Sequence, residues 1–192
     1  MRIRSLVFAA VVLLASTQLA AAQKSTATDA GEAVNGLQLA ILQHGTTKTD
    51  VPNLQVTFRN VGDRDLTVLL GIVGGYSPRP CNLDDRQVSC TLNFKLNVTD
   101  SSGKARSYEF SGIVLVAGRL DPYIVNVPAQ STYTLELGLD QFSAPRTPGS
   151  YRIALEFEGR AITYSNPNQP EAKLTFWKGT LLSNSVSIAV TK

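Results

Sequence analysis

Few residues in this chain have side chains suited to catalysis. His44 is the single histidine, and it follows a strand-like segment at 39–43. A serine nucleophile needs a histidine base and an orienting carboxylate, and the sequence has no G-x-S-x-G elbow that would present such a serine. The run 101–104 matches the S-x-x-K motif of penicillin-interacting enzymes, but it falls in a predicted hairpin turn, whereas the motif needs a helix and two companion motifs. We therefore predict that the protein is not an enzyme.

Cys81 and Cys90 are the only cysteines. An even number of cysteines this close in sequence is typical of a local disulfide in an oxidising compartment. A zinc site would need two further ligands, which a chain with one histidine and no third cysteine cannot readily supply, and a redox pair usually has C-x-x-C spacing. We predict a disulfide between Cys81 and Cys90, no metal site and no cofactor.

Residues 1–22 have the pattern of an export signal. Arg2 and Arg4 precede an apolar run at 6–15, and three alanines at 20–22 form a small-residue cleavage site of the A-x-A kind. The run is too short to cross a bilayer of roughly 30 Å, and no later segment approaches the about 20 apolar residues of a spanning helix. The sequence thus predicts a secreted or periplasmic protein with no membrane span. Its expected parts are a signal peptide at 1–22, a flexible leader at 23–33 and one domain at 34–192.

The charge of the chain argues against a nucleic-acid partner. The formal net charge is +3 for the 192 residues, and it falls to +1 once Arg2 and Arg4 leave with the signal peptide. Lysine and arginine are scattered singly along the sequence, whereas nucleic-acid binders concentrate them on one face. We expect a protein or cell-surface partner and no nucleic acid.

Apolar and polar side chains alternate along most of the chain. Such a period of two is typical of antiparallel strands that place one face on a core and the other in water. It appears at 54–59, 92–98, 133–139, 151–158 and 186–190. Less regular strands are expected at 37–42, 66–73, 108–116, 123–127 and 174–177, and a single helical turn at 139–142. Eight to ten short strands separated by turn sequences predict an all-β fold, a single antiparallel β-sandwich of immunoglobulin-like topology, with a closed barrel as the alternative.

The same alternation predicts which side chains form the core. The apolar members of the regular strands should meet between two sheets, because each strand turns them toward the same side. The expected core includes Phe58, Phe94, Leu135, Tyr151, Ile153, Leu155 and Ile188.

A family resemblance lies in the corner sequence Pro-Gly-Ser-Tyr-Arg-Ile at 148–153. It resembles the Gly-x-Tyr turn before the penultimate strand of immunoglobulin and fibronectin type III-like domains, which implies that the Tyr151 hydroxyl bonds upstream backbone. Ile153 stands where antibody domains have a cysteine, and no tryptophan lies on an early strand, so the chain departs from true antibody-type domains. Most of 34–192 is similar to uncharacterised bacterial secreted domains of this sandwich type. That similarity is carried by 54–63, 127–133, the corner and 177–186.

The segment 159–179 is the strongest candidate for a binding loop. It is longer than most connections between strands, and exposed aromatic residues on a rigid scaffold are a common means of recognition. The alternative, which we favour, is an extended hairpin in which 162–164 pairs with 174–176 and Trp177 covers the edge of the sandwich, since most large aromatic side chains are buried. The candidate binding residues are Tyr164, Asn166, Phe176 and Trp177.

The sequence favours a non-catalytic binding or accessory domain of unknown ligand, because its residues form strands and turns without a polar catalytic cluster. One alternative is an extracellular protease inhibitor, since the chain resembles bacterial intracellular proteinase inhibitors with an immunoglobulin-like sandwich. That resemblance makes Arg86, in the loop between Cys81 and Cys90, the presenting residue. A second alternative is a small hydrolase of cell-wall or sugar material, which requires folding to bring His44 or a carboxylate pair together. Asn97 begins an N-glycosylation acceptor pattern.

Overall fold

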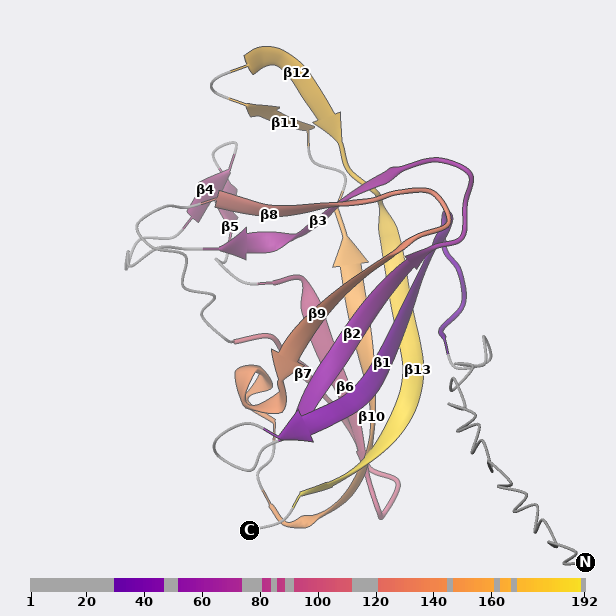
Figure 1. The fold of residues 1–192 in the computed structure, drawn as a ribbon. Helices are drawn as coiled ribbons and strands as arrows, with labels where there is room; N and C mark the ends of the chain where they lie inside the picture. Colours follow the sequence, from indigo (N-terminus) through magenta and orange to yellow (C-terminus); the bar gives the residue numbers. More distant parts are fainter. Residues whose placement is uncertain are drawn as a thin grey trace, which may run out of the picture.

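The structure is a computed structural model of the chain, and it consists of antiparallel β-sheets packed against one another (Figure 1). Its strands confirm the predicted all-β class. The described residues are 30–46, 52–73, 81–83, 86–88, 92–111, 121–144, 147–160, 163–166 and 169–190. The expected signal peptide at 1–22 and most of the expected leader lie outside these residues.

Two sheets form the body of the molecule. A three-stranded sheet has the order β1-β2-β9, and a four-stranded sheet has the order β13-β10-β6-β7. Neighbouring strands in both sheets are antiparallel, as the alternating sequence predicts. The bounds are β1 (Leu37–Thr46), β2 (Pro52–Asn60), β6 (Phe94–Asp100), β7 (Ala105–Glu109), β9 (Thr132–Gly138), β10 (Gly149–Gly159) and β13 (Gly179–Val190).

Three two-stranded ribbons and one helical turn complete the described fold. The ribbons pair β3 (Leu66–Val73) with β8 (Asp121–Val127), β4 (Cys81–Leu83) with β5 (Arg86–Val88), and β11 (Thr163–Asn166) with β12 (Gln169–Thr175). The 3-10 helix η1 (Leu139–Phe142) lies where a single helical turn was predicted. The short strands of the last two ribbons raise the strand count above the predicted eight to ten.

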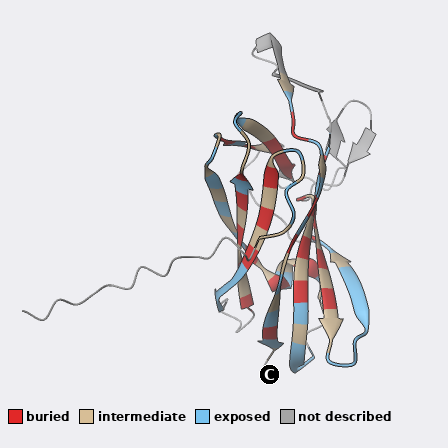
Figure 2. Ribbon diagram, turned by 90° about the vertical axis from the view of Figure 1, so that its right-hand side faces the viewer, coloured by how far each residue is buried: buried red, intermediate tan, exposed pale blue. Residues whose placement is uncertain are grey.

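The core lies between the two sheets and follows the alternation in the sequence. Along β2 and β10 buried and less buried residues alternate, which appears as separate red bands on the strands in Figure 2. The predicted core is confirmed: Phe58, Phe94, Ile153, Leu155 and Ile188 are buried in one cluster, and Leu135 and Tyr151 are partly buried against it.

The edge where the two sheets meet at β1 and β13 is held by polar contacts. Asn184 on β13 accepts a hydrogen bond from the Ile41 backbone N–H at 2.7 Å and donates one to the Ile41 carbonyl at 3.0 Å. Gly31 N–H donates to the Leu39 carbonyl at 2.9 Å. The outward edge of β1 is therefore partly covered, which limits strand pairing with another chain. It also means that Gly31, within the leader predicted to be flexible, is bonded to the sandwich.

The opposite edge is closed by η1. Phe142 of η1 packs edge-on against Phe110, with ring centroids 5.2 Å apart. The Ser111 N–H donates to the Gln141 carbonyl at 2.7 Å. These contacts link the turn after β9 to the end of β7, so both long edges of the sandwich are bridged.

Tyr151 makes the contact that its resemblance to a tyrosine corner implied. Its hydroxyl donates to the Thr147 carbonyl at 2.9 Å, four residues upstream, and lies 2.7 Å from the Thr147 hydroxyl. The bond fixes the chain where it turns into β10.

Candidate functional site

Two hairpins extend from the same end of the sandwich, the upper end in Figure 1. β11 and β12 lie between the end of β10 at Gly159 and the start of β13 at Gly179, which pair with each other. β4 and β5 lie between β3 and Leu92, and Leu92 forms a bridge with Gly71. The hairpin end, defined here as the β4–β5 and β11–β12 hairpins, is the most prominent projection from the body of the molecule.

Trp177 fixes the base of the β11–β12 hairpin. Its backbone N–H donates to the Thr67 carbonyl at 2.7 Å, and its indole N–H points to the Val34 and Asn35 carbonyls, each at 3.2 Å. The indole ring stacks on Phe157 with centroids 6.1 Å apart and is 5% exposed. A buried indole whose N–H is bonded holds the strand that leaves it in a defined position.

Two glycines make room for this indole. A Cβ on Gly159 would overlap the Trp177 ring, and a Cβ on Gly179 would lie 2.9 Å from it. Real Cβ atoms do not approach other heavy atoms this closely, so any side chain at Gly159 would displace the ring. The space that the indole occupies is therefore formed by the last residue of β10 and the first residue of β13. We call this space, with the hydrogen bonds and the stacked ring that hold the indole in it, the seat of Trp177.

The predicted binding segment divides into a hairpin and a buried anchor. Tyr164 pairs with Leu174 in the β11–β12 ribbon, which is the hairpin pairing predicted as the alternative. Phe176 is 4% exposed, and it belongs with Trp177 to the buried part. The backbone of Tyr164 and Asn166 lies in β11, and their side chains lie outside the described residues.

The predicted inhibitory loop forms the second hairpin. Leu83, the last residue of β4, pairs with Arg86, which begins β5. Cys81 starts β4, while Cys90 lies outside the described residues. The disulfide between Cys81 and Cys90 therefore stays a prediction, and so does the inhibitory role of Arg86.

His44 lies near the end of β1, as predicted. Its Nε2 is 3.7 Å from Glu136 Oε1, and both side chains are more than half exposed. Among the described residues no hydrogen bond links His44 to a serine hydroxyl. The S-x-x-K run also forms the predicted turn, because the Asp100 carbonyl accepts from Gly103 N–H at 3.0 Å between β6 and β7. The contact of His44 with Glu136 is thus exposed to solvent, and it does not form part of a catalytic triad among the described residues.

A second charged group lies on the outer face of the four-stranded sheet. Lys95 Nζ is 3.4 Å from Glu109 and 3.7 Å from Glu156. The charge of Glu109, and after it that of Glu156, raises the pKa of Lys95. Each carboxylate thus has a cation beside it, and exposed pairs of this kind contribute little to stability.

Sequence reasoning missed a pocket at the end of the sandwich opposite the hairpin end. It encloses about 130 Å³. The sequence at 104–110 contains a pattern that could have indicated this pocket. Every second residue of this stretch lies on one face of the strand, and on that face two cations are followed by two aromatic residues: Lys104, Arg106, Tyr108 and Phe110. The pocket is lined by Val98, Asp100, Lys104, Arg106, Tyr108, Thr147 and Tyr151.

Metal-binding clusters and membrane-spanning helices are both absent from the described part of the chain. No group of three or more His, Cys, Asp or Glu side chains that could hold a metal ion occurs among the described residues. None of the helices in this part of the structure has the length and apolar character to span a membrane.

Comparison with known proteins assigns no family. None of the known protein-family models matches the chain, and no curated protein matches it. Among solved structures, the chain is similar to the X-ray structure of Northeast Structural Genomics Consortium target SoR45, at 12% identity with a TM-score of 0.36, covering 83% of this chain and 90% of that one. A likeness with so low a TM-score carries no argument about fold or function.

Proposed function

We propose that the protein is a non-catalytic binding domain that acts outside the cytoplasm and contacts a protein or cell-surface partner through the hairpin end. The observation that carries this proposal is the seat of Trp177. A recognition element gains affinity when it is held in its bound position before the partner arrives, because less conformational freedom is lost on binding. Trp177 holds the β11–β12 hairpin at its base through three backbone carbonyls and one stacked ring.

The strand order supports immunoglobulin-like topology. β1, β2 and β9 follow the order of strands A, B and E of such a sandwich, and β13, β10 and β6 follow that of G, F and C. β7 then takes the place of an additional edge strand beside C, and the β3–β8 ribbon is an insertion. Loops at the ends of this architecture are frequent binding sites.

Two features of the sequence support a location outside the cytoplasm. The pattern at 1–22 is that of an export signal. Cys81 and Cys90 are close enough in sequence to form the single local disulfide that oxidising compartments allow.

A hairpin-shortened variant tests the proposal. Replacing residues 164–174 with an Asn-Gly turn joins Thr163 to Thr175, which already pair in register, and leaves Trp177 in place. The matched control is Ser101→Ala/Ser102→Ala, which changes the exposed β6–β7 turn at the other end. We expect cross-linking in the secreted and cell-surface fractions to capture the same partner with the native chain and the control, and to lose it with the shortened variant.

Two results would contradict the proposal. One is capture of the same partner by the shortened variant at native yield. The other is hydrolysis of a peptidase, esterase or glycosidase substrate that disappears in His44→Ala, because it would make the protein the hydrolase of the second alternative.

The position of Arg86 beside the β4–β5 turn favours protease inhibition as a second candidate function. A basic residue held by a hairpin suits proteases that cleave after arginine, since a fixed loop loses little freedom on binding. Inhibition of a trypsin-like protease that is lost in Arg86→Ala and kept in Arg152→Ala would establish this function. Equal inhibition by both variants would exclude Arg86 as the presenting residue.

A further inference from the structure

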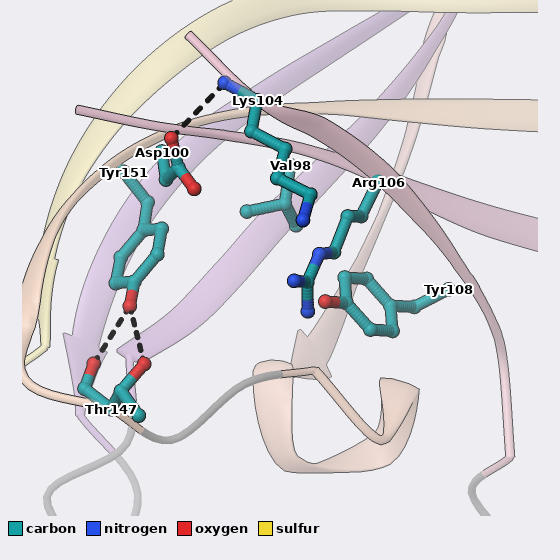
Figure 3. Close-up of a pocket in the computed structure, with 7 residues that line it drawn as sticks. All are labelled: Val98, Asp100, Lys104, Arg106, Tyr108, Thr147 and Tyr151. Atoms are coloured by element: carbon teal, nitrogen blue, oxygen red, sulfur yellow. Dashed lines mark hydrogen bonds between the residues drawn. The ribbon is translucent and has the colours of Figure 1, made fainter. Parts of the chain in front are cut away.

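The pocket opposite the hairpin end is built on the core-facing side of β6 and β7. Val98 pairs with Arg106, and Leu96 pairs with Tyr108. Directly paired residues share a face of the sheet, and Val98 and Leu96 are buried. Arg106 and Tyr108 therefore point to the core side, at the end of the sandwich where Thr147 and Tyr151 form the opposite wall (Figure 3).

Two cations line this pocket, and neither forms a salt bridge with a carboxylate among the described residues, although Asp100 lies near enough to Arg106 for their charges to interact. The Lys104 ammonium and the Arg106 guanidinium converge in Figure 3, and neither lies within 4.0 Å of a described carboxylate. Asp100 is the one carboxylate among the lining residues. Two like charges side by side favour an anion between them.

The Asp100 carboxylate accepts hydrogen bonds from within the β6–β7 turn. Its Oδ1 accepts hydrogen bonds from the Ser102 N–H at 2.9 Å, the Ser102 hydroxyl at 2.5 Å and the Lys104 N–H at 3.0 Å. The hydroxyl bond, and after it the bond from the Lys104 N–H, lowers the pKa of Asp100. These bonds orient the carboxylate toward its own turn, so it holds the shape of the pocket.

The Tyr108 hydroxyl is the second sign of a ligand. It is buried and has no hydrogen-bond partner among the described residues, and it lies beside the Arg106 guanidinium in Figure 3. The Tyr151 hydroxyl across the pocket, by contrast, bonds to Thr147. Buried polar groups without a partner are rare, and each calls for an explanation such as a bound ligand. Tyr108 is one of the residues that line the pocket, together with the exposed Arg106.

We propose that this pocket binds an oxyanion, the carboxylate or phosphate group of a small ligand. Arg106 and Lys104 supply positive charge, and the Tyr108 hydroxyl donates a hydrogen bond to an oxygen of the ligand. A guanidinium presents several N–H donors in a plane, which suits both carboxylate and phosphate. The volume of about 130 Å³ is about four times the 30 Å³ that a water molecule takes up in the liquid, which is enough for one such group.

The first test is titration of the full mature chain with sodium phosphate and, separately, with sodium acetate, at an ionic strength kept constant with sodium chloride. Backbone amide NMR shifts report on the site. We expect saturable shifts at 104–108 and at Tyr151 with at least one of the two anions. The dissociation constant should rise at least tenfold in Arg106→Gln. Arg152→Gln is the matched control, because it removes the same charge from the exposed outer face of β10.

The second test is Tyr108→Phe, which removes only the unpartnered hydroxyl. We expect anion affinity to fall several-fold while the urea midpoint is unchanged or higher, since the hydroxyl bonds nothing among the described residues.

The outcomes of the two tests decide the proposal and the ligand group. The anion whose addition gives saturable shifts identifies the group that the pocket binds. Shifts that do not saturate with either anion would overturn the proposal, as would equal weakening in Arg152→Gln and Arg106→Gln. A Tyr108→Phe chain that loses stability and keeps its affinity would overturn the role of the hydroxyl. All these outcomes concern the end of the molecule opposite the hairpin end, so they are independent of the proposed partner.

Discussion

Leu155 and Leu182 carry the same side chain on the neighbouring strands β10 and β13, but they face opposite sides of the sheet. Leu155 is fully buried between the sheets, and Leu182 is 53% exposed on the outer face. This difference in burial arises because successive side chains of a strand point to opposite faces of the sheet. A shift of the strand register by one residue would therefore move each side chain to the other face. This pair therefore offers a direct test of the strand register.

We expect Leu155→Ala to lower the free energy of unfolding by about 2 to 5 kcal/mol, because it removes buried methyl groups and leaves a cavity. Leu182→Ala should change it by less than about 0.5 kcal/mol, as surface substitutions do. Urea denaturation of both variants measures the difference. Similar costs for the two variants would contradict the register of β10.

Tyr123 and Tyr133 form a hydroxyl pair with their oxygens 2.7 Å apart. Burial, followed by the hydrogen bond to Tyr123, raises the pKa of Tyr133 to about 12. An unfolded tyrosine titrates near 10, so above that pH the unfolded chain releases a proton that the folded chain retains. Stability is thus fully present below about pH 10 and is lost as the pH rises toward 12.

We expect the urea midpoint of the native chain to fall between about pH 10 and pH 12 more steeply than that of Tyr133→Phe, which has no proton to lose there. Parallel pH profiles would show that Tyr133 has an ordinary pKa in the folded chain. Absorbance titration of the phenolates in both chains provides an independent check, since one tyrosine should ionise late.

At the scale of the elements, the seat of Trp177 depends on the two glycines at the ends of β10 and β13. The size of the side chain at the end of a strand is usually not restricted by neighbouring atoms. A glycine at such a position would therefore be interpreted from the sequence as a turn residue. Here Gly159 is needed because the indole occupies the space of its side chain. The hairpin and the sandwich are thereby joined through packing as well as through the backbone.

Gly159→Ala should destabilise the protein by roughly 1 to 3 kcal/mol, because the added methyl group must displace a buried ring. Its exposed neighbour Glu158→Ala is the matched control, with an expected change below about 0.5 kcal/mol. Tryptophan fluorescence reports on Trp177 directly, since it is the single tryptophan of the chain. An emission spectrum and a urea midpoint unchanged in Gly159→Ala would place the indole elsewhere.

The side-chain amide of Asn184 on β13 bonds both the N–H and the carbonyl of Ile41 on β1. It thus makes the two hydrogen bonds that a peptide group of a neighbouring strand would otherwise make. Asn184→Ala should therefore leave the Ile41 N–H without its acceptor. Because a hydrogen bond contributes about 1 kcal/mol, exchange of the Ile41 amide should become about fivefold faster through local opening. Hydrogen exchange measured by NMR tests this, with the exposed Ser187→Ala on the same strand as control. Unchanged exchange at Ile41 would show that the amide is protected by another group.

The sequence predicted most of the strands because their pattern is local, but the strand expected at 108–116 is found at Ala105–Glu109, and 112–116 lies outside the described residues. Leu66–Val73 and the turn at Leu139–Phe142 have the predicted bounds, since alternation and flanking turn residues determine them. The role of Asn184 could not be predicted, because it acts on β1 from 143 residues further along the chain. Polar side chains that replace a strand partner leave no periodic signal.

The candidate sites were predicted only in part. The hairpin alternative for 159–179 is confirmed in its pairing, because strand-like runs flanked a proline-rich turn. The hairpin prediction also placed Trp177 over the edge of the sandwich, and Trp177 is buried. Its contacts with Val34, Asn35 and Phe157 could not be predicted, because those residues come from other parts of the chain. The pocket around Arg106 was missed because cations in an alternating strand are normally assigned to the solvent face.

On the scale of the whole molecule, the hairpin end and the oxyanion pocket lie at opposite ends of the same sandwich (Figure 1). Changes at sites far apart with no shared partners normally act additively. The hairpin-shortened variant should therefore bind phosphate or acetate as the native chain does, and Arg106→Gln should capture the same partner as the native chain. Coupling between the two ends, measured by the same NMR titration with and without the captured partner, would contradict this independence.

The contacts of Asn184 and Trp177 also bear on how the molecule comes to be folded. Asn184 and Ile41 are 143 residues apart, and so are Trp177 and the Val34 carbonyl that its indole meets. A ribosome makes the chain from its amino end, so Ile41 on this edge of β1 has no Asn184 partner until the chain has been made as far as β13. Contacts between such distant residues slow folding, because the intervening loop must close first. A nascent chain that stops before β13 would leave the edge of β1 open to other strands, and the assembly of this sandwich is therefore governed by its last strand.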